Sequence, residues 1–140
     1  MSMGTHMYLA KEGKTGLDDW VNAITMHGLL QVGYDMIGLC KFVGVGMGHE
    51  LIADAIREAT GLEIKSADIV AAVRRAFLRG LALELRQGYQ DDEYTLPSQV
   101  FDDPNPNVTL PNFVTREFFT QLKQRVWEVF RKEMEGLLPE

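Results

Sequence analysis

The feature that most constrains the fold is an apolar residue at every fourth position of one long segment. The residues with this spacing are Ile69, Val73, Phe77 and Leu81, and the small residues Ala72, Ala76 and Gly80 accompany them. On an α-helix this spacing places the apolar side chains on one face, and the small residues let a second helix approach closely. The pattern predicts a long helix that begins at Ser66 as its N-cap and ends at Gly88.

Three further segments have the periodicity of helices. They comprise residues 17–30 with an extension toward Asp35, residues 50–60 ended by Gly61, and residues 115–135 with Thr115 as the N-cap. Residues 89–113 contain prolines at 97, 104, 106 and 111, and we expect no helix there. No segment alternates apolar and polar residues over the length of a strand. The sequence therefore predicts an all-α domain of about four main helices with a long Pro-rich loop.

Length and charge limit the possible partners. The chain of 140 residues is long enough for one domain, and its 14 basic and 20 acidic residues give a formal net charge of −6. This balance argues against a nucleic-acid partner or an anionic membrane surface, and no run of about 18 apolar residues is present to span a membrane. We expect residues 1–16 to be a tag-like or flexible N-terminal segment and residues 17–140 to form a single helical domain.

The single cysteine, Cys40, excludes an internal disulfide and suits the reducing cytoplasm, where we expect the protein. One thiolate cannot by itself hold an iron–sulfur cluster, which normally has four protein ligands. The three histidines, His6, His27 and His49, lack metal-ligand spacing, so we expect no histidine metal site. The glycines at 44, 46 and 48 do not follow a predicted strand, and no third glycine has the spacing of a dinucleotide site. We interpret them as a turn between helices.

Residues 35–42 (DMIGLCKF) are the remaining candidate for chemistry. Asp35 places a carboxylate at a helix end, Gly38 allows a ligand to approach closely, and Cys40 adds a thiol five residues after the carboxylate. A carboxylate only accepts hydrogen bonds, so a buried one pairs with N–H donors or with a cation, while a thiolate can be a metal ligand or a nucleophile. From the residues alone, a helix C-terminal turn with a buried, apolar cysteine remains the competing interpretation.

This segment resembles the Asp-x-x-Gly-Leu-Cys signature of the aldehyde ferredoxin oxidoreductase family, whose members are tungsten- or molybdenum-pterin enzymes. Asp35, Gly38, Leu39 and Cys40 match the signature, and Lys41 and Phe42 are also typical after it. The signature lies in the C-terminal helical domain of the family, and the resemblance extends over residues 17–100. It implies the fold of that domain.

The resemblance implies a role for each matched residue. Asp35 would accept hydrogen bonds from one pterin, Cys40 would be the last of four ligands of a [4Fe–4S] cluster, and Gly38 and Leu39 would shape the cofactor-binding turn. The other three cysteines of the family lie in a Cys-x-x-Cys-x-x-x-Cys run, which this chain lacks. We therefore expect tungstopterin or molybdopterin and the cluster in a complete enzyme, and no cofactor on this chain alone.

The implied function is that of the C-terminal domain of an enzyme that oxidises aldehydes to carboxylic acids and passes the electrons to ferredoxin. Its partners would be the missing N-terminal and middle domains, or a separate subunit that carries them. The isolated chain would be inactive, with no catalytic residue of its own. The alternative is a stand-alone helical interaction module that keeps the fold without redox chemistry and buries its apolar surface in a homodimer.

Overall fold

The computed structural model describes residues 9, 12–27, 29–40, 47–90, 95–102, 111 and 113–135. Every regular element in this part of the chain is helical, so the expected all-α class is confirmed. In chain order the elements are α2 (Leu17–Asn22), the π-helical turn η1 (Ala23–His27), α3 (Leu30–Met36), α4 (His49–Thr60), α5 (Ser66–Arg86), α6 (Gln99–Asp102) and α7 (Arg116–Met134).

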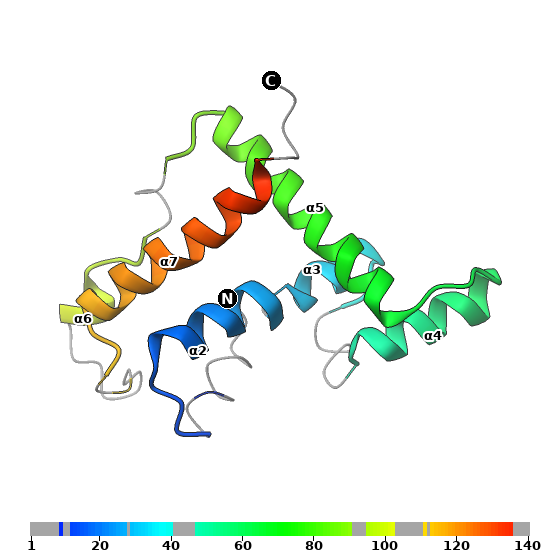
Figure 1. Cartoon of the computed structure of the whole chain (residues 1–140), viewed down its shortest axis with the longest axis horizontal. Coiled ribbons are helices and arrows are strands. Elements are labelled where there is room, and N and C mark those ends of the chain that lie inside the picture. The colour runs from blue at the N-terminus through cyan, green and yellow to red at the C-terminus, as the bar shows by residue number, and fades with distance from the viewer. Residues whose placement is uncertain are drawn as a thin grey trace.

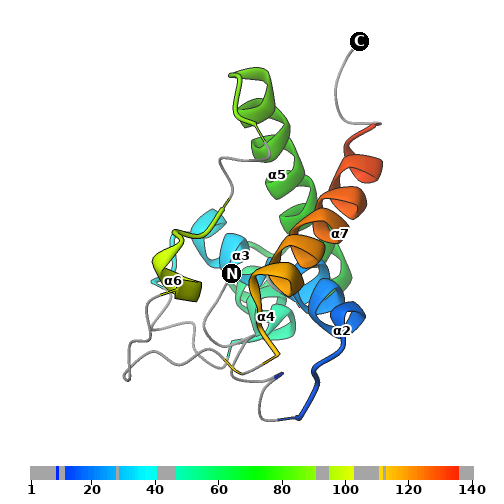
Figure 2. The ribbon, with the colours of Figure 1, turned by 90° about the vertical axis from the view of Figure 1, so that its left-hand side faces the viewer.

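The two long helices, α5 and α7, form a V. They come together near the C-terminal end of α7 and diverge toward their N-terminal ends (Figure 1). The elements α2, η1 and α3 lie across the open side of this V, and α4 packs against α5. Viewed from the side, α6 lies beside the N-terminal end of α7 (Figure 2), where the centroids of the Phe101 and Phe119 rings are 5.8 Å apart.

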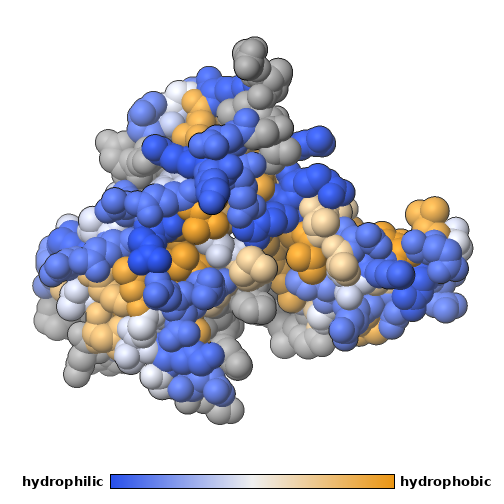
Figure 3. Space-filling model, in the orientation of Figure 1, coloured by the Kyte–Doolittle hydropathy of each residue, from blue (hydrophilic) through white to orange (hydrophobic). Residues whose placement is uncertain are grey.

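Two hydrophobic clusters fill the spaces between these helices. The larger cluster lies among α3, α4, α5 and the C-terminal half of α7, and it contains the buried Val73 and Phe130. The smaller cluster lies between α2 and the N-terminal half of α7, around Trp20 and Leu122, and Val126 packs against both clusters. Apolar side chains also reach the surface in the middle of the molecule, bordered by hydrophilic ones (Figure 3).

The stripe that predicts the long helix is the face of α5 that enters the larger cluster. Ile69, Val73 and Leu81 are buried there, and Phe77 is partly buried. The expected N-cap is wrong by one residue, because Ser66 is already helical and Lys65 is the capping residue. The carboxylate of Asp68 accepts a hydrogen bond from the Lys65 backbone N–H at 2.9 Å, which satisfies a donor that the start of a helix leaves open.

The expected C-terminal end of α4 and the expected N-cap of α7 are confirmed. Gly61 follows α4 in the left-handed conformation, with φ at 72°, as a C-terminal glycine does. The Thr115 hydroxyl accepts a hydrogen bond from the Phe118 N–H at 3.1 Å and so caps the start of α7.

From its prolines we expected no helix in the connection between α5 and α7, and this expectation is wrong. The four-residue helix α6 forms between Pro97 and Pro104. The Phe101 ring packs on α7, and Arg116 donates a hydrogen bond to Asp102 at 2.7 Å. The prolines exclude a long helix in this connection but allow a single helical turn between them. Contacts with α7 hold that turn in place.

The first predicted helix is not continuous. The π-helical turn η1 separates α2 from α3, and sequence periodicity gave no sign of it. Within η1 the Thr25 hydroxyl donates to the Val21 carbonyl at 2.9 Å, and the Thr25 carbonyl accepts from Nη1 of Arg74 at 2.6 Å. The first bond is local, and the second ties the π-turn to α5.

Arg74 connects three elements of the fold. Its Nε and Nη2 atoms each lie 2.5 Å from a carboxylate oxygen of Glu133, so that α5 and α7 are joined by a two-pronged ion pair. Its Nη1 reaches the η1 carbonyl of Thr25. The hydrogen bond from Arg74 lowers the pKa of Glu133, and the same bond raises the pKa of Arg74. The Arg74 side chain is 21% exposed and that of Glu133 34%, so water screens the pair in part.

Part of the segment that we expected to be tag-like or flexible contacts the fold. Leu9 is buried in the smaller cluster, and the indole N–H of Trp20 donates to the Lys14 carbonyl at 3.1 Å. Residues 1–8, 10 and 11 lie outside the described part of the chain.

The Arg74–Glu133 pair predicts a specific pH dependence of stability. Glu133→Gln should lower the free energy of unfolding by about 1–2 kcal/mol at pH 7, because a hydrogen-bonded charge is lost in a partly screened position. Because the folded-state pKa of Glu133 is lowered, the stabilisation is present above the unfolded value of about 4.3 and disappears as the pH falls through the folded value. Urea titrations between pH 3 and pH 7 measure this difference.

Glu128→Gln is the matched control, because Glu128 lies on the exposed face of the same helix and only accepts from Gln124 at 3.2 Å. It should leave the pH profile close to that of the original chain. A Glu133→Gln profile that is parallel to the original one would contradict the role given to the ion pair.

Candidate functional site

The candidate motif forms the C-terminal turn of α3. The Leu39 N–H donates to the Tyr34 carbonyl at 2.9 Å, and the Gly38 N–H donates to the Asp35 carbonyl at 3.2 Å. If Tyr34 is counted as residue 1 of the turn, the first bond joins residues 6 and 1 and the second joins residues 5 and 2. This pair of bonds defines a Schellman motif. They satisfy carbonyl groups that would otherwise have no partner at the end of the helix.

The requirements of this turn account for two of the four motif residues. Gly38 has φ at 71°, in the left-handed region where a side chain is strained. Leu39 follows it and packs against the larger hydrophobic cluster, to which Tyr34 also belongs. An apolar contact of this kind commonly accompanies a Schellman motif. Gly38 and Leu39 therefore shape the turn, and direct contact of either with a cofactor stays a prediction.

The other two motif residues, Asp35 and Cys40, face solvent. Asp35 is exposed, and its carboxylate accepts a hydrogen bond from Nε2 of Gln31 at 3.2 Å. Cys40 is an exposed, free thiol. The competing interpretation of a buried, apolar cysteine is therefore wrong. The turn brings the carboxylate and the thiol to the surface at its two ends, and the packing of the described residues uses neither of them.

The position of Asp35 is electrostatically unfavourable for the helix. It lies in the last turn of α3, where the partial charge of the helix dipole is negative, and that turn contains no basic residue. Beside it Met36 is 50% exposed and Ile37 is 40% exposed. A carboxylate, a thiol and two large apolar side chains thus share one exposed turn.

Residues outside the motif hold the turn in place. The Tyr34 hydroxyl donates to the Met47 carbonyl at 2.6 Å and so links α3 to the segment before α4; burial raises the pKa of this phenol. α3 also approaches α5 closely: a Cβ atom built on Gly33 would lie 3.1 Å from Val73 Cγ2. Sequence analysis did not identify Tyr34 or Gly33, although both lie directly before the motif.

The described residues contain no group of three or more histidine, cysteine, aspartate or glutamate side chains that could hold a metal ion. His49 is the first residue of α4, while His6 and the glycines at 44 and 46 lie outside the described residues, as does the side chain of His27. Among the described helices, none combines the length and hydropathy needed to cross a membrane.

The turn itself offers two groups for chemistry: the Asp35 carboxylate, which accepts hydrogen bonds, and the Cys40 thiol, which can become a thiolate.

The turn geometry predicts opposite effects of the same substitution at two glycines. Gly38→Ala should lower the free energy of unfolding by about 1 kcal/mol, because alanine is strained at a positive φ and no atom lies within 4 Å to add a clash. Gly80→Ala in the interior of α5 should raise it by roughly 0.5–1 kcal/mol, because alanine is the better helix former. Denaturant unfolding measures both, and a neutral Gly38→Ala would show that the turn is misassigned.

Comparison with known proteins agrees with the motif. The family model described as "Aldehyde ferredoxin oxidoreductase, domains 2 & 3" matches residues 7–137, which include the turn and every described helix. No curated protein and no solved structure matches the chain significantly. Because the family model covers most of the chain, the chain belongs to the aldehyde ferredoxin oxidoreductase family.

Proposed function

We propose that the turn at the end of α3 completes a cofactor site in an enzyme that oxidises aldehydes to carboxylic acids with ferredoxin as the electron acceptor. Cys40 would supply one thiolate to a [4Fe–4S] cluster, and Asp35 would accept hydrogen bonds from N–H groups of a tungsten- or molybdenum-bound pterin. The observation that supports this proposal most strongly is the exposure of both side chains on a turn whose other motif residues serve the fold.

The donor set fits a shared site. A carboxylate only accepts hydrogen bonds, so Asp35 suits the amino and ring N–H groups of a pterin, and each such charge-assisted bond contributes about 1.5–3 kcal/mol. A cluster needs about four protein ligands, of which Cys40 can be one. The remaining ligands would come from other domains of the enzyme or from a separate subunit. When bound, the pterin metal would supply the two-electron oxidation chemistry and the cluster would conduct the electrons.

The chain's own residues would bind and orient these groups. Gln31 donates to the Asp35 carboxylate and fixes one of its oxygens, which leaves the other free to face a pterin. Met36 and Ile37 would be covered by the polypeptide that carries the other ligands, and this contact would exclude water from the site. The thiol role requires a reduced Cys40, in keeping with the expected cytoplasmic location.

A second candidate function is a helical interaction module without redox chemistry. The exposure of Met36 and Ile37 favours it as well, because a second copy of the chain could cover them. The two candidates differ in Cys40, since a module of this kind has no use for its thiolate.

The cluster assignment predicts the effect of Cys40→Ser in the assembled enzyme. The chain is co-expressed with a polypeptide that carries a Cys-x-x-Cys-x-x-x-Cys run, and iron, sulfide and visible absorbance are measured per complex. Cys40→Ser should greatly reduce the cluster content, because a serine oxygen is a poorer iron ligand than a thiolate. Ser98→Ala, at another exposed position, should leave it unchanged. A full cluster in the Cys40→Ser complex would favour the interaction module.

The pterin assignment predicts that Asp35→Asn stabilises the chain alone but lowers the pterin content of the assembled enzyme. In the chain alone it should raise the free energy of unfolding by about 0.3–1 kcal/mol, because it removes a negative charge from the C-terminal turn of α3 while keeping an acceptor for Gln31. In the assembled enzyme it should lower the pterin content, because the charge-assisted bonds are lost. A loss of stability together with unchanged pterin content would give Asp35 a structural role instead.

A further inference from the structure

Asp35 and Cys40 are held in the fold by different contacts, and those of Asp35 lie within α3. This helix packs directly on α5, where a Cβ atom built on Gly33 would lie 3.1 Å from Val73 Cγ2. Gln31, one turn earlier in the same helix, donates to the Asp35 carboxylate at 3.2 Å. The position of the carboxylate therefore follows from the packing of α3.

Cys40 lies beyond the end of α3, which is Met36. The turn closes with the hydrogen bond of the Leu39 N–H, and the part of the chain that the structure describes shows no hydrogen bond to Cys40 itself. The next described residue along the chain is Met47. Within the described residues, the position of Cys40 thus depends on how Leu39 and Met47 are anchored on either side of it.

Tyr34 anchors both of these neighbours. Its carbonyl accepts from the Leu39 N–H at 2.9 Å, and its hydroxyl donates to the Met47 carbonyl at 2.6 Å. The Tyr34 side chain is buried in the larger hydrophobic cluster, against which Leu39 and Met47 also pack. The hydroxyl bond is directional, unlike these apolar contacts. It joins two points of the chain that are 13 residues apart and have Cys40 between them.

We propose that the Tyr34 hydroxyl is a positioning group for Cys40 and not for Asp35. This inference rests on the proposed function, in which Asp35 and Cys40 serve different cofactors. Loss of the bond to Met47 leaves α3 and the Asp35 carboxylate in place, and it lets the Cys40 thiolate move relative to the other ligands of the cluster. A ligand that must be ordered on binding lowers affinity, so the bond favours capture of the cluster.

The single cysteine allows a direct test in the chain alone. A nitroxide spin label is attached to Cys40 in one protein and to residue 36 in another, which carries Met36→Cys and Cys40→Ser, and its mobility is measured by electron paramagnetic resonance. Position 36 is exposed and ends α3, so this label reports on the helix. Tyr34→Phe keeps the ring in the cluster and removes only the hydroxyl. It should raise the mobile fraction of the label at Cys40 roughly two- to tenfold, as expected for the loss of one hydrogen bond, and leave the label at residue 36 unchanged.

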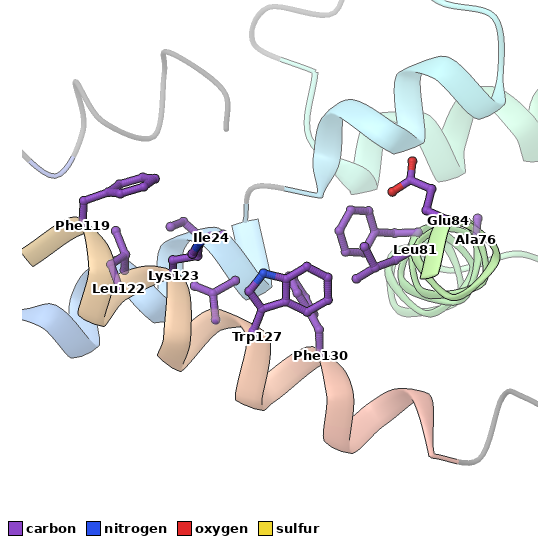
Figure 4. A pocket seen from close by; sticks show the side chains of 12 residues that line it. Ile24, Ala76, Leu81, Glu84, Phe119, Leu122, Lys123, Trp127 and Phe130 are labelled. Atoms are coloured by element: carbon purple, nitrogen blue, oxygen red, sulfur yellow. The ribbon is translucent and has the colours of Figure 1, made fainter. Parts of the chain in front are cut away.

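Phe119→Leu is the matched control for a general loss of stability. Phe119 lines an apolar pocket between α5 and α7, and none of the residues that line this pocket belongs to the turn (Figure 4). Its ring centroid lies 5.8 Å from that of Phe101, so the substitution removes an aromatic contact. The variant should lower the melting temperature without changing either label. Thermal unfolding also verifies that Tyr34→Phe is folded.

In the assembled enzyme, Tyr34→Phe should lower the cluster content per complex and leave the pterin content unchanged. The proposal is overturned if the label at Cys40 is unaffected, if both labels become equally mobile, or if both cofactors are lost together. A complex that binds neither cofactor even with Tyr34 intact would contradict the proposed function, whereas the two labels would still decide the role of Tyr34.

Discussion

The guanidinium group of Arg74 determines how the parts of this fold are held together. The smaller hydrophobic cluster lies against the N-terminal half of α7 and the larger one against its C-terminal half, and Val126 packs against both. Arg74 binds Glu133 on α7 and the Thr25 carbonyl of η1. Apolar packing alone is not directional, whereas these hydrogen bonds fix the position of η1 relative to both long helices. The π-turn, and through it the start of α3, depends on this arrangement.

The motif at the end of α3 combines residues that the turn requires with residues that it does not require. The Schellman geometry requires a residue such as Gly38 at the positive φ and favours an apolar one such as Leu39 after it. It does not require a carboxylate in the last turn or a thiol after the turn. Asp35 even opposes the helix dipole, so the stability of the turn does not account for its carboxylate. The geometry of the turn thus explains Gly38 and Leu39 but does not explain Asp35 and Cys40.

Much of the architecture could be predicted because it depends on local patterns. The four-residue apolar spacing identified α5, Gly61 identified the end of α4, and Thr115 identified the start of α7. Features that depend on distant partners were missed or misplaced. The π-turn accepts a hydrogen bond from Arg74, which lies 49 residues away from Thr25, and α6 packs on α7 through the Phe101–Phe119 contact. The candidate site was found by its motif, but periodicity could not show that Cys40 is exposed or that Tyr34 holds the turn through Met47.

The central claim is that the exposed thiol of Cys40 becomes an iron ligand when the rest of the enzyme is present. The most direct measurement is an anomalous-scattering experiment at the iron absorption edge on crystals of the assembled complex. We predict iron peaks within bonding distance of Cys40 Sγ, next to a pterin hydrogen-bonded to Asp35. A fully occupied cluster held by other ligands, with Cys40 left in contact with water or with a second copy of the chain, would contradict the account.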